Sequence, residues 1–225
     1  MISVVILAPN QDSISKRTSD SLSFADEVIH IPVSDDFAQA RNEGMEEAEY
    51  EWILFIDSDE EESKELAENI GKLDLNQTKI GAFSIPRRDF FWGTELKYGE
   101  TNSARNEGII RLVKKGSGKW VGKVHEVFQT SGATGALSGF INHYPHQTIA
   151  AFLESINNYS TLRAQELKGK GVRTNVFQII MYPFGKFWYT YLLKLGFLDG
   201  PAGFVYSFMM SFHSFLVRSK LYLKQ

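Results

Sequence analysis

The stretch Trp52-Ile53-Leu54-Phe55-Ile56-Asp57-Ser58-Asp59-Glu60 joins a short apolar run to a cluster of acids. Five apolar residues bounded by polar ones are typical of a buried strand. In open α/β sheets, ligands bind beyond the carboxyl ends of the strands. Asp57 and Asp59 follow at such an end, and carboxylate oxygens suit Mg²⁺ or Mn²⁺ that is completed by substrate phosphates. The stretch therefore predicts an α/β sheet with a metal-assisted site for a phosphate-bearing substrate.

The same acids have a second interpretation, because acidic residues after a strand often cap the next helix. Ser58 or Asp59, followed by Glu60-Glu61-Glu62-Ser63, would form a favourable acidic first turn. Both interpretations predict a strand over 52–56, and they differ in whether the acids bind a ligand.

Strand and helix patterns alternate along the first third of the chain, which is typical of parallel βαβ units. We expect strands at Ile2–Leu7, Glu27–Ile31 and Trp52–Ile56. Helices are expected at Asp12–Ser23, from the Ser34-Asp35-Asp36 cap to Ala48, and at Ser63–Leu73. No basic leader precedes Ile2, so the first residues are expected to form a strand rather than a signal peptide.

The middle of the chain predicts further strands, and the last third predicts helices. The expected strands are Gly81–Pro86, Gly108–Val113, Trp120–Gln129 and Ala136–His143, with a loop over Arg87–Thr101. A helix is expected over Thr148–Lys168, with an apolar face of Phe152, Ile156, Tyr159 and Leu162. Lys168-Gly169-Lys170-Gly171 is the expected linker. We therefore expect a first domain over 1–150 and a helical extension over 151–225.

Charge is distributed unevenly, although the net charge is only −3. Residues 1–62 carry 16 acids and 3 bases, which gives −13, and residues 163–225 carry 9 bases and 2 acids, which gives +7. The tail also holds 14 of the 30 aromatic residues, between Phe177 and Tyr222. There is no cysteine, which excludes disulfides and thiolate metal sites and fits a reducing compartment.

An acidic first part with a basic, aromatic tail predicts that the tail meets an anionic surface. Val176–Phe197 is interrupted by Pro183 and two lysines, and Gly200–Val217 is shorter and more polar than the roughly 20 apolar residues that a spanning helix needs. We therefore expect amphipathic helices on a membrane surface. The alternative is that the aromatic side chains pack on the protein's own core or on a second subunit.

Several short motifs occur in one order along most of residues 24–225. They are Asp36-Phe37-Ala38-Gln39-Ala40-Arg41-Asn42, the Trp52 to Glu60 stretch, Arg111-Leu112-Val113, Trp120-Val121-Gly122-Lys123-Val124-His125-Glu126, Asn142-His143-Tyr144 and Gly196-Phe197-Leu198-Asp199-Gly200 with Gly203-Phe204. They resemble glycosyltransferase family 2, which has the GT-A fold, and look most like the branch with the lipopolysaccharide-core β-glucosyltransferases. The resemblance implies a Rossmann-like α/β domain with a mostly parallel central sheet, here followed by a helical, aromatic-rich extension.

The resemblance also implies a metal-dependent, inverting transfer of a sugar from a nucleotide-diphosphate sugar to a hydroxyl acceptor. Asp57 and Asp59 match the family's DxD motif, whose acids hold Mn²⁺ or Mg²⁺ and meet the donor's ribose and diphosphate. His143 matches a further metal ligand, with His146 as its rival. The other candidates for contacts with the nucleotide or the substrate are Pro9, Asn10, Asp35, Asp36, Arg41, Arg111 and Trp120.

Two of these candidates have structural alternatives. Arg41 matches a family position near the nucleotide, but an arginine in this pattern could also lie on a solvated helix face. Trp120 is either a platform on which a sugar stacks or a core residue.

An inverting transfer needs a base that takes the proton from the acceptor hydroxyl. His125-Glu126 stands where the family carries its Trp…His-Glu motif. The resemblance therefore implies Glu126 as the base and His125 as a supporting ligand or acceptor contact. The alternative is a salt bridge at a strand end.

Two segments depart from the family pattern. After the second expected strand, Pro32-Val33-Ser34-Asp35-Asp36 replaces the usual Asp-Ser-Gly-Ser-Thr-Asp, and a helix-sized piece is missing from the sequence. After the first strand, Pro9-Asn10-Gln11-Asp12 lacks the usual Lys-Asn-Glu. The departures leave a degenerate GT-A protein, acting as a non-catalytic membrane-bound binding or assembly module, as the alternative function. A phosphatase with an aspartyl nucleophile is disfavoured, because Glu60 stands where such enzymes need Thr or Val.

The expected partners are a nucleotide-sugar donor, a glycan or lipid-linked acceptor and an anionic membrane surface, and no nucleic acid. The expected location is cytoplasmic, peripheral on the inner face of the cell membrane. Self-association through the C-terminal helices is the alternative use of the aromatic tail.

Overall fold

The computed structural model describes residues 1–32, 36–75, 77–122, 126–146 and 148–224. The chain forms two compact units: unit 1 comprises Met1–Arg88 and Ser103–His143, and unit 2 comprises Asp89–Asn102 and Tyr144–Gln225. The expected domains, 1–150 and 151–225, stay a prediction. The units differ from them chiefly in that Asp89–Asn102 groups with the C-terminal helices.

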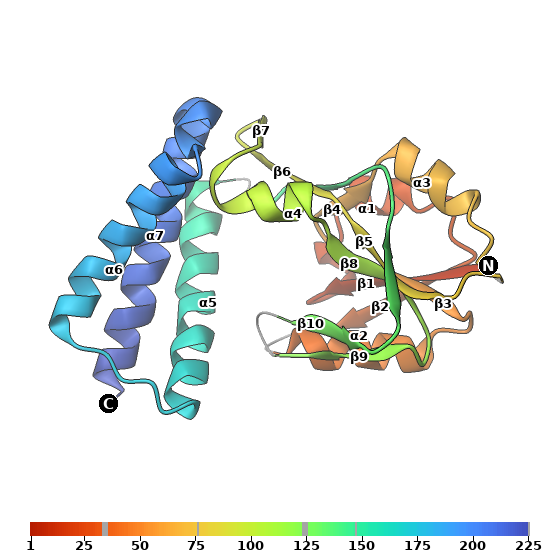
Figure 1. The fold of residues 1–225 in the computed structure, drawn as a ribbon, viewed down its shortest axis with the longest axis horizontal. Coiled ribbons are helices and arrows are strands. Elements are labelled where there is room, and N and C mark those ends of the chain that lie inside the picture. Colours follow the sequence, from red (N-terminus) through yellow and green to blue (C-terminus); the bar gives the residue numbers. More distant parts are fainter. Residues whose placement is uncertain (33–35, 76, 123–125, 147, 225) are drawn as a thin grey trace. The chain divides into compact units, whose positions relative to one another are not determined.

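A six-stranded sheet forms the centre of unit 1, in the order β11-β5-β8-β3-β1-β2 (Figure 1). Its strands are β1 (Ile2–Ala8), β2 (Glu27–Pro32), β3 (Trp52–Asp57), β5 (Ile80–Ile85), β8 (Ile109–Lys114) and β11 (Ala133–Ala136). β1 pairs in parallel with β2 and β3, and β11 with β5, whereas β8 is antiparallel to both of its neighbours. The expected α/β fold with a parallel-rich central sheet is confirmed, and the carboxyl ends of β1, β2 and β3 share one edge.

Both faces of this sheet are covered, which explains why β1 and β3 are apolar along nearly their whole length. Even-numbered side chains such as Leu54 pack with α3 (Lys64–Gly71) and the residues that flank α1 (Lys16–Ser21). Odd-numbered side chains such as Phe55 pack with α2 (Phe37–Glu47). A Cβ atom on Gly44 of α2 would lie 2.5 Å from Cγ1 of Val5, so glycine is what allows this helix to approach the sheet.

The acidic run after β3 is a strand and not a helix start. β4 (Glu60–Glu62) pairs antiparallel with β12 (Ile141–His143), and α3 begins only at Lys64, after the cap Ser63. The interpretation of these acids as a first helical turn is therefore wrong. Strand pairing with residues about 80 positions later in the sequence, which local pattern cannot reveal, decides their conformation.

Three other elements differ from the expected ones. Trp120–Gln129 is a hairpin and not one strand: β9 (Gly118–Val121) pairs antiparallel with β10 (Val127–Thr130). Ala136–His143 is divided between β11 and β12. Asp12–Ser23 is divided between the short helix η1 (Gln11–Ser13) and α1.

The loop expected over Arg87–Thr101 is mostly regular structure. β6 (Arg87–Phe91) and β7 (Thr94–Leu96) form a hairpin, followed by the short helices η2 (Gly99–Thr101) and α4 (Asn102–Asn106). Trp92 and Gly93 have φ angles of 51° and 73°, the left-handed pair of a tight two-residue turn. A bulky aromatic residue at such a turn position is unusual, which is why the sequence pattern did not predict the hairpin.

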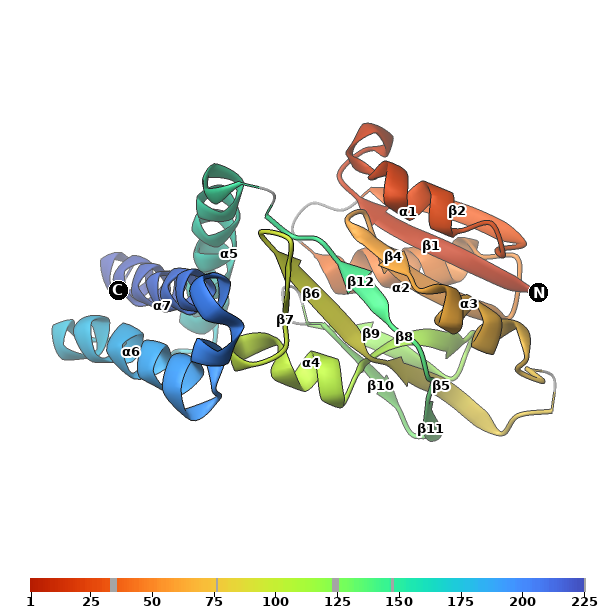
Figure 2. The same cartoon turned by 90° about the horizontal axis from the view of Figure 1, so that it is seen from above.

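Three long helices make up most of unit 2: α5 (Ile149–Gly169), α6 (Val176–Trp188) and α7 (Gly200–Leu223). α7 packs on both of the others, and the two views show α6 and α7 side by side (Figures 1 and 2). α5 buries Phe152 and Ile156 as expected, but Tyr159 is exposed and the buried stripe continues through smaller residues. Of the helices in the described part of the chain, none is long and apolar enough to cross a membrane.

The turn that leads into α7 explains the glycine-rich motif at 196–203. After the π-helical turn η3 (Tyr189–Leu193), the short helix η4 (Gly196–Asp199) packs against α7. A Cβ atom on Gly203 would lie 2.0 Å from the carbonyl oxygen of Gly196, so this crossing needs glycine. The Asp199 carboxylate accepts hydrogen bonds from the backbone N–H groups of Lys97 and Tyr98, at 3.1 and 2.9 Å. In this structure the motif organises unit 2.

Candidate active site

Asp57 ends β3, and two arginines hold its carboxylate. Arg111 from β8 donates to both oxygens, at 2.7 Å to Oδ2 and 3.3 Å to Oδ1, and Arg41 from α2 donates to Oδ1 at 3.0 Å. β8 runs antiparallel to β3, and this direction brings Arg111 toward the carboxyl end of β3. Burial raises the pKa of Asp57, but Arg111 and Arg41 outweigh burial and hold this pKa well below its usual range.

Arg41 joins Asp57 to the expected base. Its Nε and Nη2 atoms lie 3.1 and 3.0 Å from Oε1 of Glu126, which directly precedes β10. The guanidinium also lies over the ring of Trp120, 4.9 Å from the ring centroid. Because the Arg41 side chain is only 2% exposed, the alternative of a solvated helix face is wrong.

Glu60 is a site residue that the sequence did not reveal. Its fully buried carboxylate accepts a 2.8 Å bond from Arg111 through Oε1 and a 3.0 Å bond from the backbone N–H of Asp57 through Oε2. Burial raises the pKa of Glu60, and the neighbouring Arg111 only partly opposes this effect. Three consecutive glutamates give no sign of which one is inside. Only the assumption that these residues form a strand would have identified Glu60, because side chains alternate along a strand and β4 turns Glu60 and Glu62 inward.

Asp57, its two arginines and Glu126 line one cavity of about 530 Å³, whereas Glu60 lies behind them and is not part of the lining. The charged members of its wall are Arg41, Asp57, Arg87, Arg111 and Glu126. Trp120 and a group of apolar residues, Ile109, Ile110, Val127 and Phe128, complete the lining.

Three buried N–H groups on this wall lack a hydrogen-bond acceptor within the described part of the chain. They are Nη1 of Arg41, Nε of Arg111 and Nε1 of Trp120. Buried donors are normally paired, so a wall with three unmatched donors favours an acceptor-rich ligand such as a phosphate or a sugar. Trp120 itself is 5% exposed and packs edge-on against Phe55.

Of the three expected metal ligands, Asp59 and His143 lie close together, whereas Asp57 is bound by arginines. Nε2 of His143 lies 3.5 Å from Oδ1 of Asp59, so the two side chains can reach one cation and supply a nitrogen and an oxygen. His143 lowers the pKa of Asp59 against the opposing effect of burial. Both oxygens of Asp57, in contrast, accept bonds from arginine. Within the described ranges, no group of three or more His, Cys, Asp or Glu side chains is arranged to hold a metal.

The other sequence candidates lie elsewhere. Pro9 and Asn10 are exposed after β1, and the Asn10 side chain caps η1 by accepting a bond from the N–H of Ser13. Asp36 caps α2 by accepting a bond from the N–H of Gln39. His146 belongs to unit 2, where its ring stacks on Phe152 at 4.0 Å. Asp35 and His125 lie outside the described residues.

Comparisons with known proteins identify similar sequences. Residues 22–119 match the model of the family described as glycosyl transferase family 2. The chain is 27% identical over 195 residues to LpsC of Rhizobium meliloti (strain 1021), a lipopolysaccharide core biosynthesis glycosyltransferase, with 83% of this chain and 69% of the relative covered. It is 25% identical over 185 residues to RT0209 of Rickettsia typhi, an uncharacterized glycosyltransferase, with 76% of this chain and 62% of the relative covered.

Solved structures give a weaker likeness. The crystal structure of S. aureus TarS 1–349 in complex with UDP-GlcNAc has a TM-score of 0.45 at 10% identity, with 95% of this chain and 81% of that chain covered. The present chain spans 69% and 62% of the lengths of the two curated relatives. The family match supports a nucleotide-sugar glycosyltransferase. Residues 22–119 are therefore similar to glycosyltransferase family 2, and the chain resembles the lipopolysaccharide-core branch of that family.

Proposed function

We propose that the cavity of unit 1 binds a nucleotide-diphosphate sugar and that the chain is an inverting glycosyltransferase that passes the sugar to a hydroxyl acceptor. The observation that carries this proposal is the single network in which Arg41 joins Asp57 to Glu126 on the wall of one cavity. The unmatched N–H groups of Arg41 and Arg111 support diphosphate binding, because guanidinium groups match phosphate oxygens in geometry and charge.

Asp59 and His143 are the residues that would hold Mn²⁺ or Mg²⁺. Such a cation is commonly bound by one or two protein groups and completed by substrate phosphates, which agrees with a pair of side chains rather than a full cage. The bound ion would supply Lewis-acid stabilisation of the charge on the departing diphosphate. In this proposal Asp57 holds Arg41 and Arg111 in place by accepting their hydrogen bonds, and it contacts the ribose of the donor.

Glu126 is the proposed base. Its carboxylate takes the proton of the acceptor hydroxyl as the hydroxyl oxygen bonds to the anomeric carbon, and the bond from that carbon to the diphosphate breaks on the opposite face. Both contacts with Arg41 end on Oε1 of Glu126, and among the described residues Oε2 accepts no hydrogen bond, so we assign Oε2 to the hydroxyl. Arg41 is thus a positioning residue that holds the base in relation to Asp57.

The acceptor that we propose is a glycan or lipid-linked hydroxyl, consistent with the role of the similar protein LpsC in lipopolysaccharide core biosynthesis. Residues 163–225, with a charge of +7, would attach peripherally to an anionic membrane on the cytoplasmic side. The second candidate function is a non-catalytic binding module. It is favoured by one observation, namely that arginines already occupy both oxygens of Asp57.

A thermal-shift screen tests the donor site. UDP-glucose, UDP-N-acetylglucosamine and GDP-mannose would be added with and without Mn²⁺ to the wild type, Asp59→Asn and Glu126→Gln. A true donor at 100 times its Kd should stabilise the wild type by about 2.7 kcal/mol in the presence of Mn²⁺. Asp59→Asn should lose the Mn²⁺-dependent part, and Glu126→Gln should keep it.

Asp12→Asn is the matched control, because Asp12 is an exposed acid in the same unit. Equal stabilisation with and without Mn²⁺ would refute the metal role of Asp59 but not the donor site. No stabilisation by a wide panel of nucleotide-sugars would refute the donor site itself. Donor binding without any release of sugar would support the binding module.

A further inference from the structure

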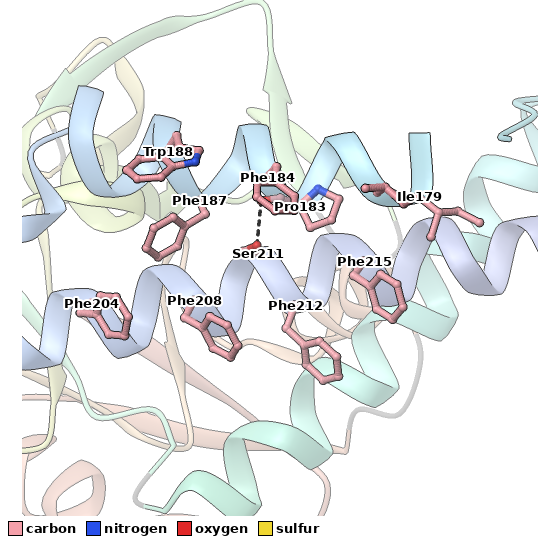
Figure 3. A pocket seen from close by; sticks show the side chains of 11 residues that line it. Ile179, Pro183, Phe184, Phe187, Trp188, Phe204, Phe208, Ser211, Phe212 and Phe215 are labelled. Carbon is pink, nitrogen blue, oxygen red and sulfur yellow. Dashed lines mark hydrogen bonds between the residues drawn. The ribbon is translucent and has the colours of Figure 1, made fainter. Parts of the chain in front are cut away.

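Unit 2 contains an apolar groove that the proposed sugar transfer does not use. The groove of about 590 Å³ runs between α6 and α7 (Figure 3). Aromatic side chains from both helices line it, chiefly Phe184, Phe187, Trp188, Phe204, Phe208 and Phe212. The lining hydroxyl of Ser211 donates a 2.7 Å bond to the carbonyl of Pro183, so it ties the two helices together and is not left for a ligand.

The aromatic side chains of the groove are exposed to water, which is unfavourable for apolar groups. Phe184 is 61% exposed, Phe208 is 55% exposed, and the described residues of α6 include none that is buried. Contiguous exposed apolar surface of this kind marks a binding site. Side chains from both helices line this groove, which suits a narrow apolar chain (Figure 3).

A cationic group stands next to the groove. Arg218 lies one turn beyond Phe215 on α7, and its guanidinium is placed over the ring of Tyr182 at 4.0 Å. Tyr182 directly precedes the groove residue Pro183 on α6. An arginine at this position can pair with a phosphate whose attached chain lies in the groove.

We propose that the α6–α7 groove binds one hydrocarbon chain of an anionic phospholipid, with the lipid phosphate beside Arg218. Charge decides against a second copy of this chain as the occupant. Two copies that met through this face would each bring the +7 charge of residues 163–225, whereas an anionic lipid is attracted to it. The proposal rests on the membrane association proposed above and deepens it, and it is independent of the sugar-transfer chemistry.

Trp188 provides a direct readout, because it lines the groove. The probe is lysophosphatidylglycerol with a brominated chain, used below its critical micelle concentration, since bromine quenches tryptophan fluorescence on contact. The wild type should show saturable quenching. Trp188→Phe keeps the apolar lining and should lose that quenching, although Trp52, Trp92 and Trp120 remain. Persistent quenching in Trp188→Phe would place the lipid elsewhere and overturn the proposal.

Matched substitutions separate groove binding from general interfacial attraction. Phe208→Asp places a charge inside the groove and should weaken binding about tenfold or more. Phe177→Asp makes the same change at a residue that is 70% exposed and outside the lining, and it should leave binding nearly unchanged. Equal losses in the two variants, at matched circular dichroism, would mean that the tail binds lipid only as an amphipathic surface.

Two further measurements complete the test. Arg218→Gln should weaken binding of the brominated lysophosphatidylglycerol but not of a brominated neutral monoacylglycerol, because only the former carries a phosphate. A stable dimer in analytical ultracentrifugation that Phe208→Asp dissociates and the lysolipid does not would assign the groove to a second copy. Quenching is read without nucleotide-sugar, so failure here and failure of the transferase proposal are distinguishable.

Discussion

Unit 1 buries charged side chains, whereas unit 2 exposes apolar ones. In unit 1, Arg41, Glu60 and Arg111 are almost inaccessible to solvent and lie in one network around Asp57. In unit 2, the aromatic side chains of α6 and α7 are left open to solvent along a groove. Neither arrangement adds much to the stability of the fold. Buried ion pairs lose their hydration, and exposed aromatic side chains do not gain the free energy of being buried. We relate both arrangements to the proposed ligands: an anionic, hydroxyl-rich one in unit 1 and an apolar one in unit 2.

The largest expected effect is on the buried network of unit 1. Arg41→Met should lower the free energy of unfolding by about 3 kcal/mol, because it removes a buried guanidinium and leaves the partly buried acids Asp57 and Glu126 with fewer partners. Urea unfolding followed by circular dichroism measures this change. Lys114→Met is the control, since Lys114 forms an exposed pair with Glu51 and should cost at most about 1 kcal/mol. If Arg41→Met and Lys114→Met lower the free energy of unfolding by similar amounts, the buried network of unit 1 has no special importance for stability.

A smaller loss of stability is expected in unit 2 when Asp199, a charged group that accepts hydrogen bonds within the unit, is replaced. Asp199→Ala should destabilise the protein by about 1–3 kcal/mol, because the N–H groups of Lys97 and Tyr98 lose their acceptor. The same unfolding experiment measures it. Asp199→Asn keeps one acceptor oxygen and should recover part of the loss. If alanine at 199 has no effect, the glycine-rich motif around it has a role other than organising the turn into α7.

The smallest expected effect depends on pH. Burial raises the pKa of Glu62 in the folded state above its ordinary value of 4.5, so the folded protein holds a proton that the unfolded chain has released. Stability therefore falls as pH rises through the window between these two pKa values. Glu62→Gln should be more stable than the wild type at pH 7, and this difference should disappear at pH 4.

The control for that measurement is Glu68→Gln, because Glu68 is 69% exposed on α3. The same substitution at this exposed position gives the baseline against which the Glu62→Gln difference is measured. A difference between Glu62→Gln and the wild type that persists at pH 4 would mean that packing, and not ionisation, causes it.

Local pattern predicted the parts of the fold that local interactions determine. The apolar runs of β1 and β3, a cap near Asp36 for α2 and a helix over Thr148–Lys168 were expected, and the structure has β1, β3, the Asp36 cap and α5. The misses depend on partners that are distant in sequence or on unusual turns. β4 needs β12, and the β6–β7 hairpin needs a left-handed Trp92.

In the candidate site, too, some residues could be predicted from local sequence and others depend on partners that are distant in the sequence. Asp57, Arg41 and Glu126 could be named from the sequence as candidates, and the structure brings them together. That Arg111 and Arg41 share Asp57, and that Glu60 is the buried glutamate, could not be predicted, because both follow from the packing of α2, β3, β4 and β8. The roles given to these residues stay predictions until they are tested in solution.

The rate of sugar release from a bound nucleotide-sugar tests the central claim most directly. Water can replace the acceptor in this assay, so the acceptor need not be known. The account predicts that Glu126→Gln lowers the rate of Mn²⁺-dependent release by about 10²-fold or more, since the base is lost, while the donor Kd stays the same. A rate that falls only a few-fold, or a Kd that rises by the same factor as the rate falls, would contradict the assignment of Glu126 as the base held by Arg41.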